Sequence, residues 1–93
     1  RRKPVVIEGA IEEIEVDEVI VSIGVSPNPL IPQSFSGLDV TKWGTIVVNQ
    51  ESMQSAVNHI YAGGDIVRGG ATVILAMGDG RKAAAAMDAD LKK

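Results

Sequence analysis

The chain has 93 residues, of which 45% are hydrophobic and 23% are charged, and this balance is typical of a folded globular protein. Its net charge of −3 lacks the basic excess that nucleic-acid binding needs, and no apolar run approaches the ~18 residues of a membrane span. The absence of cysteine excludes thiolate metal sites, iron–sulfur clusters and cysteine nucleophiles, and a single histidine, His59, makes a histidine-based metal site unexpected. We expect one domain at most, in the cytoplasm.

Five segments carry the β-branched or alternating pattern of strands: residues 4–8, 11–16, 19–24, 45–49 and 60–62. Gly9 lies between the first two, so we expect a hairpin there, with the acidic residues of the second strand on a wet face. The third segment is apolar without alternation, which is typical of a strand buried on both faces. Three prolines between residues 26 and 32 predict an irregular loop.

Residues 71–91 predict one long C-terminal helix, because they are rich in Ala and Met and contain no proline. Apolar and small residues recur on one helical stripe: Val73, Met77, Gly80, Ala84, Met87 and Leu91. Gly78 and Gly80 each disfavour a helix by ~1 kcal/mol relative to alanine. We therefore expect these glycines to let the helix press closely on a sheet. The fold class expected is α/β, or α+β for an isolated piece, with short strands in a mixed sheet.

The passage from residues 60–65 into this helix has the features of a ligand site. Gly63 and Gly64 end a strand, so a ligand could approach the backbone closely. Asp65 could accept hydrogen bonds from ligand hydroxyls, and the helix N-terminus presents unpaired N–H groups to a negative or electron-rich atom. The arrangement suits a nucleotide-like ligand, and it suits equally well a tight turn with a solvated aspartate.

The other charged residues are expected to be structural or solvated. Four aspartates form no pair of defined geometry: Asp39, Asp79, Asp88 and Asp90. Arg68 follows Asp65 in a loop and is expected at the surface, with a contact to a cofactor or a neighbouring domain as the alternative. His59 is expected to be a structural or surface residue, and Arg1 and Arg2 are expected to be exposed.

Residues 53–65 resemble the second FAD-binding motif of flavoproteins with two dinucleotide-binding domains, in which a Thr, an apolar-aromatic-Ala strand and Gly-Asp follow in order. Ser55 stands here where Thr is usual. Residues 17–24, with Pro27 and Asn28, resemble the crossing from the NAD(P)H domain to the FAD domain of that family. Residues 44–49 resemble the strand that follows. The three motifs span nearly the whole chain, and their sequences resemble most the small-subunit family of NADPH-dependent glutamate synthase.

The resemblance implies roles for six residues. Asp65 matches the acid that hydrogen-bonds the flavin ribitol chain, and Gly64 matches the glycine beside which the cofactor lies. Thr72 and Val73 match the helix-start positions whose amides face the pyrimidine end of the flavin. Two further residues match the crossing near the cofactors: Ile23 and Gly24.

The same resemblance implies a C-terminal piece of an FAD- and NAD(P)H-dependent oxidoreductase. Residues 1–24 would end the NAD(P)H domain and residues 25–93 would belong to the FAD domain, with the rest of the flavoprotein or its large subunit as partner. The parent would pass electrons from NADPH through FAD. No metal is expected in this chain.

The family's main FAD site, a Gly-x-Gly-x-x-Gly turn after a first strand, is missing here. Residues 78–83 fit its spelling but lie inside the expected helix. We therefore expect no catalysis by this chain alone. Its unpartnered strand edges and helix stripe should favour a homo-oligomer. The alternative is an autonomous protein-interaction module without a cofactor.

Overall fold

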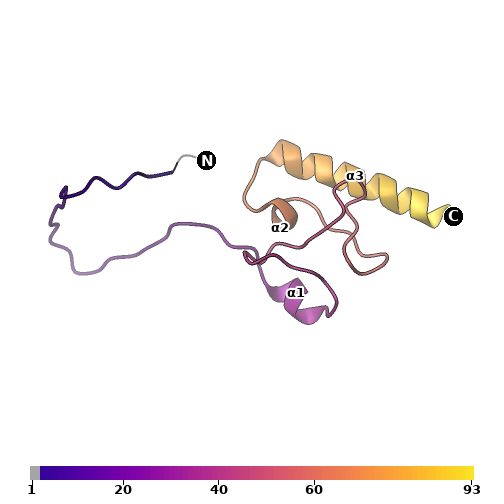
Figure 1. Ribbon diagram of the computed structural model, residues 1–93, viewed down its shortest axis with the longest axis horizontal. Helices are drawn as coiled ribbons and strands as arrows, with labels where there is room; N and C mark the ends of the chain where they lie inside the picture. Colours follow the sequence, from indigo (N-terminus) through magenta and orange to yellow (C-terminus); the bar gives the residue numbers. More distant parts are fainter. Residues whose placement is uncertain (1–2) are drawn as a thin grey trace.

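The computed structural model describes residues 3–93, in which three helices form: α1 (Leu30–Ser34), α2 (Asp65–Arg68) and α3 (Val73–Leu91). The helices belong to a folded body from which the N-terminal residues extend (Figure 1). The radius of gyration is 18.8 Å, against roughly 12 Å for a compact chain of this length. None of these helices is long and apolar enough to cross a membrane. The expected exposure of Arg1 and Arg2 concerns residues outside the described part.

Residues 3–29, called the arm below, contain no helix or strand. A turn forms near the expected Gly9, where the Ala10 N–H donates to the Ile7 carbonyl at 3.3 Å, but the two limbs do not pair as a hairpin. Eleven apolar side chains of the arm are 59–90% exposed: Val5, Val6, Ile7, Ile11, Ile14, Val16, Val19, Ile20, Val21, Ile23 and Val25. A strand forms only where a neighbouring strand makes hydrogen bonds with its N–H and C=O groups. The three strands expected here are therefore absent, since the described residues supply no such neighbour.

Residues 38–64, called the meander below, replace the expected mixed sheet. They form three isolated antiparallel bridges, at Val40–Ile46, Val48–Ser55 and Gln54–Tyr61. Each bridge ends at once because the chain reverses direction every few residues, as in the turn closed by the Asn49 N–H on the Gln54 carbonyl at 2.9 Å. The strands expected at residues 45–49 and 60–62 survive only as members of these bridges.

The core lies where the meander meets α3. Met53 is fully buried and packs with Ile46, Val48 and Ala83. Met53 has a φ of +61°, a left-handed conformation that costs roughly 1–3 kcal/mol for a residue other than glycine. Complete burial of its side chain contributes a comparable amount, so packing holds the backbone in this conformation.

The long helix is confirmed, and its bounds differ from the expected residues 71–91 by two residues at the start. Thr72 is the N-cap, and its hydroxyl accepts a hydrogen bond from the Leu75 N–H at 3.3 Å. The side of α3 turned to the body carries small and acidic residues: Ala76, Asp79, Ala83, Ala86 and Asp90. The apolar stripe expected from the sequence is exposed instead, with Val73 at 75% and Leu91 at 86%. Small side chains let the meander come close, and the larger stripe has no partner within the described residues.

Gly63 is the point of close approach between the meander and α3. A Cβ atom at Gly63 would lie 2.8 Å from the Cβ of Asp79, whereas one at Gly78 or Gly80 would meet nothing within 4 Å. The expectation that the helix glycines serve close packing is therefore wrong for the described part of the chain, because the close contact uses a glycine on the other side.

We predict opposite effects for two Gly→Ala substitutions. Gly63→Ala should destabilise the chain by about 1–3 kcal/mol, since Asp79 must move to admit the new methyl group. Gly80→Ala should stabilise it by up to ~1 kcal/mol, since open space surrounds a helical position with a poor helix former. Urea unfolding followed by circular dichroism at 222 nm measures both. Equal effects of the two substitutions would contradict this packing.

Candidate functional site

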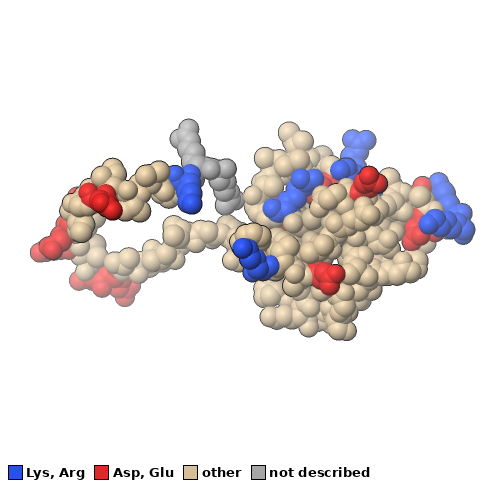
Figure 2. All heavy atoms as spheres, viewed as in Figure 1, with Lys and Arg blue, Asp and Glu red and all other residues tan. Residues whose placement is uncertain are grey.

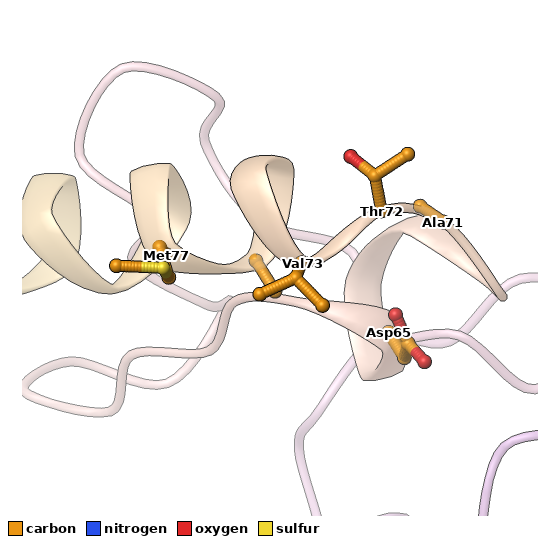
Figure 3. Close-up of a pocket in the computed structure, with 6 residues that line it drawn as sticks. Asp65, Ala71, Thr72, Val73 and Met77 are labelled. Atoms are coloured by element: carbon orange, nitrogen blue, oxygen red, sulfur yellow. The ribbon is translucent and has the colours of Figure 1, made fainter.

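A hollow of about 430 Å³, called the first hollow, lies between α2 and the start of α3 (Figure 3). Its lining residues are Asp65, Ala71, Thr72, Val73, Ala76 and Met77. Three of the six candidate residues therefore line one space. The turn from residue 69 to residue 72 joins the two helices and brings the first residue of α2 near the first turn of α3.

The two polar candidates reach this hollow in different ways. Asp65 begins α2, and its carboxylate is exposed. The side chain of Thr72 points away from Asp65 in Figure 3, while its backbone leads into the first turn of α3. Thr72 occupies the Leu75 amide with its hydroxyl, which leaves the amides of Val73 and Ile74 without intrahelical acceptors. The hollow thus combines a carboxylate acceptor with helix-start donors.

Gly64 shapes the turn before Asp65. Its φ of +82° and ψ of −148° lie in a region that is accessible essentially to glycine alone. A Cβ atom at this residue would lie 3.6 Å from the Cβ of Ala76, so Gly64 packs against α3. Gly64 does not line the hollow, so its role is to permit the sharp backbone turn directly before Asp65.

Asp65 also borders a second hollow of about 340 Å³, on the side of the arm. Its other lining residues are Val25, Ser26, Pro27, Asn28, Ile66, Gly69 and Gly70. Ile23 and Gly24 line neither hollow, and Ile23 is 87% exposed. The residues near Asp65 are therefore those that directly follow Ile23 and Gly24. Two of them, Pro27 and Asn28, belong to the crossing motif.

An ion pair between a buried carboxylate and a partly exposed guanidinium adjoins the glycine turn. The Asp79 carboxylate is 1% exposed, and it accepts hydrogen bonds from Arg68 Nε and Nη2, both at 2.7 Å, and from the Gly64 N–H at 3.0 Å. We call Asp79 with these two partners the clamp. The expectation of a solvated Asp79 is wrong. Arg68 lies at the surface, as expected, but in α2 and not in a loop, and its guanidinium binds Asp79. The carboxylate stays ionised in its buried position because the bidentate hydrogen bonds of the Arg68 guanidinium compensate its negative charge.

The clamp changes the acidity of its members. The hydrogen bonds from Arg68 and from the Gly64 N–H lower the pKa of Asp79 to about 2, against the opposing effect of burial. The same hydrogen bond raises the pKa of Arg68. Asp79 is therefore ionised, and Arg68 protonated, throughout the neutral range.

The sequence holds a signal for this buried acid. Asp79 lies three residues after Ala76 and four before Ala83, on one stripe of small residues. Small residues mark the part of a helix that packs most closely. An aspartate there is buried, and a buried aspartate needs a cation or hydrogen-bond donors as partners. The predicted stripe of larger apolar residues lies on a neighbouring face of α3, about 100° around the helix from these small residues.

A smaller polar cluster lies near the end of α3. Asp90 contacts His59 Nδ1 at 2.9 Å and accepts a hydrogen bond from the Tyr61 hydroxyl at 3.3 Å. The hydrogen bond with His59 lowers the pKa of Asp90. His59 lies at the surface, as expected, and the cluster fastens the meander to the last turn of α3.

Known proteins resemble this chain over most of its length. A family model described as pyridine nucleotide-disulphide oxidoreductase matches residues 1–80. The small chain of glutamate synthase [NADPH] from Azospirillum brasilense is 39% identical over 94 residues, which cover 99% of this chain and 19% of the relative.

Two other relatives carry different names and similar coverage. The beta subunit of NADP(+)-dependent formate dehydrogenase from Moorella thermoacetica is 35% identical over 95 residues, covering all of this chain and 13% of the relative. The glutamate synthase [NADPH] small chain from Escherichia coli is 32% identical over 87 residues, covering 90% of this chain and 18% of the relative. The chain thus spans less than a fifth of the length of these relatives.

We predict that acid weakens the attachment of α3 through Asp79. Its pKa is about 2 in the folded chain and about 3.9 in an unfolded one, so the stabilisation is present above about pH 4 and is lost as the pH falls through 2. The urea midpoint of the unsubstituted chain should therefore fall over this interval. Asp79→Asn should lower the midpoint at pH 6 and flatten its pH dependence, with the remaining slope due in part to Asp90. Asp88→Asn, an exposed position of α3, is the control and should retain the full slope.

Proposed function

Since the chain belongs to the pyridine nucleotide-disulphide oxidoreductase family, we propose that it supplies the C-terminal side of a flavin site in an NAD(P)H-dependent oxidoreductase. It would be a piece of the FAD domain, with residues 1–24 ending the NAD(P)H domain. FAD in the parent protein would take up hydride from NADPH and deliver electrons onward. The 93 residues alone would bind and orient part of the cofactor without catalysing the reaction.

The observation that carries this proposal is that Asp65 and the start of α3 line one hollow. A flavin presents hydroxyl groups on its ribityl chain and electron-rich atoms at its pyrimidine end. The exposed Asp65 carboxylate is suited to accept hydrogen bonds from the hydroxyls. The amides at Thr72 and Val73 carry the positive end of the helix dipole, which favours the electron-rich end, above all when the flavin is reduced.

The glycine turn and the crossing complete the proposed site. Gly64 would serve the site through the sharp turn that it permits before Asp65, since it packs against Ala76 and does not line the first hollow. Residues 25–28 border Asp65 through the second hollow. Ile23 and Gly24 directly precede that run, and we assign them to the connection between the two domains, with their contact to a cofactor made through this neighbouring segment.

The partners proposed are the remainder of the flavoprotein or a large subunit. The Azospirillum and Escherichia relatives are named small chains of glutamate synthase [NADPH], and such a name implies a larger chain in those proteins. The exposed apolar arm provides a surface for either partner.

The arm also supports a second candidate function, a protein-interaction module that needs no cofactor. Apolar side chains that remain this exposed on a single chain form a patch of the kind that associates. We predict that the isolated chain is a dimer or larger. Light scattering over a dilution series measures this, and a monomer mass at all concentrations would count against it.

The two functions differ in an absorption experiment. The purified chain is mixed with FAD, desalted and scanned in the visible range, in parallel with a chimera in which it replaces the matching segment of the Azospirillum relative. Retained flavin in the chimera is expected under the first proposal. No flavin in a folded chimera would reject it, provided that the unaltered relative retains flavin in the same procedure.

We further predict that Asp65→Ala in the chimera weakens FAD binding about 10- to 100-fold, which corresponds to the loss of one charge-assisted hydrogen bond. The melting temperature of the flavin-free chimera should stay unchanged, since the Asp65 side chain is exposed. Asp88→Ala removes an exposed carboxylate elsewhere on the chain and serves as the control. Equal flavin affinity for both variants would remove Asp65 from the site.

A further inference from the structure

The two halves of the first hollow belong to different helices. Asp65 is the first residue of α2, and Val73 is the first residue of α3. The link between them includes Gly69, which has a φ of +76° and open space around it. Such a link does not fix a distance by itself. Whatever holds α2 against α3 therefore sets the spacing between the carboxylate and the helix-start amides.

The clamp is the device that joins these helices. Asp79 lies on the second turn of α3, and its two oxygens receive the Gly64 N–H just before α2 and the Arg68 guanidinium at the end of α2. The three hydrogen bonds thus hold α2 by both ends. Packing adds to this hold, because Gly63 and Gly64 lie against Asp79 and Ala76 respectively.

We propose that Asp79 and Arg68 are positioning residues of the flavin site, which fix Asp65 and the N-terminus of α3 at one spacing. This inference rests on the proposed function for its ligand, and on the clamp for its geometry. Neither Asp79 nor Arg68 lines the first hollow. They act on a ligand there through the positions of Asp65 and the α3 amides.

The ion pair has no net charge, so it does not itself favour the oxidised or the reduced flavin through its charge. Disturbing the clamp would let the α3 N-terminus move relative to Asp65. A reduced flavin carries more negative charge than an oxidised one, so it gains more from the positive end of the helix. Loss of position should therefore weaken the reduced state more than the oxidised state. A purely structural ion pair would alter stability and leave this ratio unchanged.

Two variants disturb the clamp to different degrees. In the first, Asp79→Asn keeps an oxygen for the Gly64 N–H but loses the charge that binds Arg68, and Arg68→Gln removes the unpaired positive charge that would itself favour reduced flavin. Arg68→Lys keeps the charge but loses the bidentate geometry, and it is the milder change. Asp88→Asn, exposed on the same helix and paired with Lys92, is the matched control.

The first measurement is the flavin reduction potential of the FAD-loaded chimera. We expect the Asp79→Asn/Arg68→Gln variant to reduce the affinity for reduced flavin about tenfold more than that for oxidised flavin, which lowers the two-electron potential by about 30 mV. Arg68→Lys should shift the potential in the same direction by less, and the control should not shift it. Variants that melt at lower temperature but keep the potential of the unsubstituted chimera would overturn the proposal.

The second measurement needs no flavin and uses the 93-residue chain itself. Amide hydrogen exchange should become faster at the hydrogen-bonded amides of Gly64, Leu75 and Ala76 in Asp79→Asn/Arg68→Gln, and less so in Arg68→Lys, while the control matches the unsubstituted chain. Unchanged exchange at these amides in both variants would overturn the positioning role. A chimera that binds no FAD would reject the flavin function alone, because the exchange result still decides whether the clamp sets the spacing.

Discussion

The carboxylate of Asp79 joins three parts of the folded body: α3, which carries it, the glycine turn at Gly64, and Arg68 at the end of α2. A carboxylate removed from water is costly unless charge and hydrogen bonds compensate it, so Gly64 and Arg68 must both be in place wherever this helix packs. The close approach of the meander to Asp79 explains why a residue without a side chain is needed at Gly63, and α2 ends at Arg68 where Gly69 follows with a φ of +76°. Figure 2 shows the contrast with the arm, whose acidic side chains stand free in solvent.

The parts of the fold that could be predicted from the sequence are those with local causes. The helix at residues 73–91 follows from its composition and from Thr72, whose hydroxyl caps an amide three residues away. A strand depends instead on a partner that is distant in sequence. Residues 19–24 have the right composition for a buried strand, yet they stand exposed because nothing among residues 3–93 pairs with them.

The candidate site divides along the same line. Asp65, Thr72 and Val73 could be grouped in advance because a short turn separates them, and the structure places them around one hollow. Asp79 was missed because its partner, Arg68, is known only once α2 folds back on α3. The positive φ of Met53 had no signal either, since it results from burial against Ile46 and Ala83 and not from any turn residue.

The clamp has a consequence for the order of assembly. Arg68 and Asp79 are 11 residues apart, and a loop of about this length closes in roughly 10–100 ns. The entropy lost in closing so short a loop is small compared with that of bringing distant segments together. The glycine turn and the helix start can thus come together before the arm meets any partner. Under the proposed function, the rest of the flavoprotein would then dock onto a half-site already in its final shape, so that the binding of a flavin need not supply the free energy of folding this half.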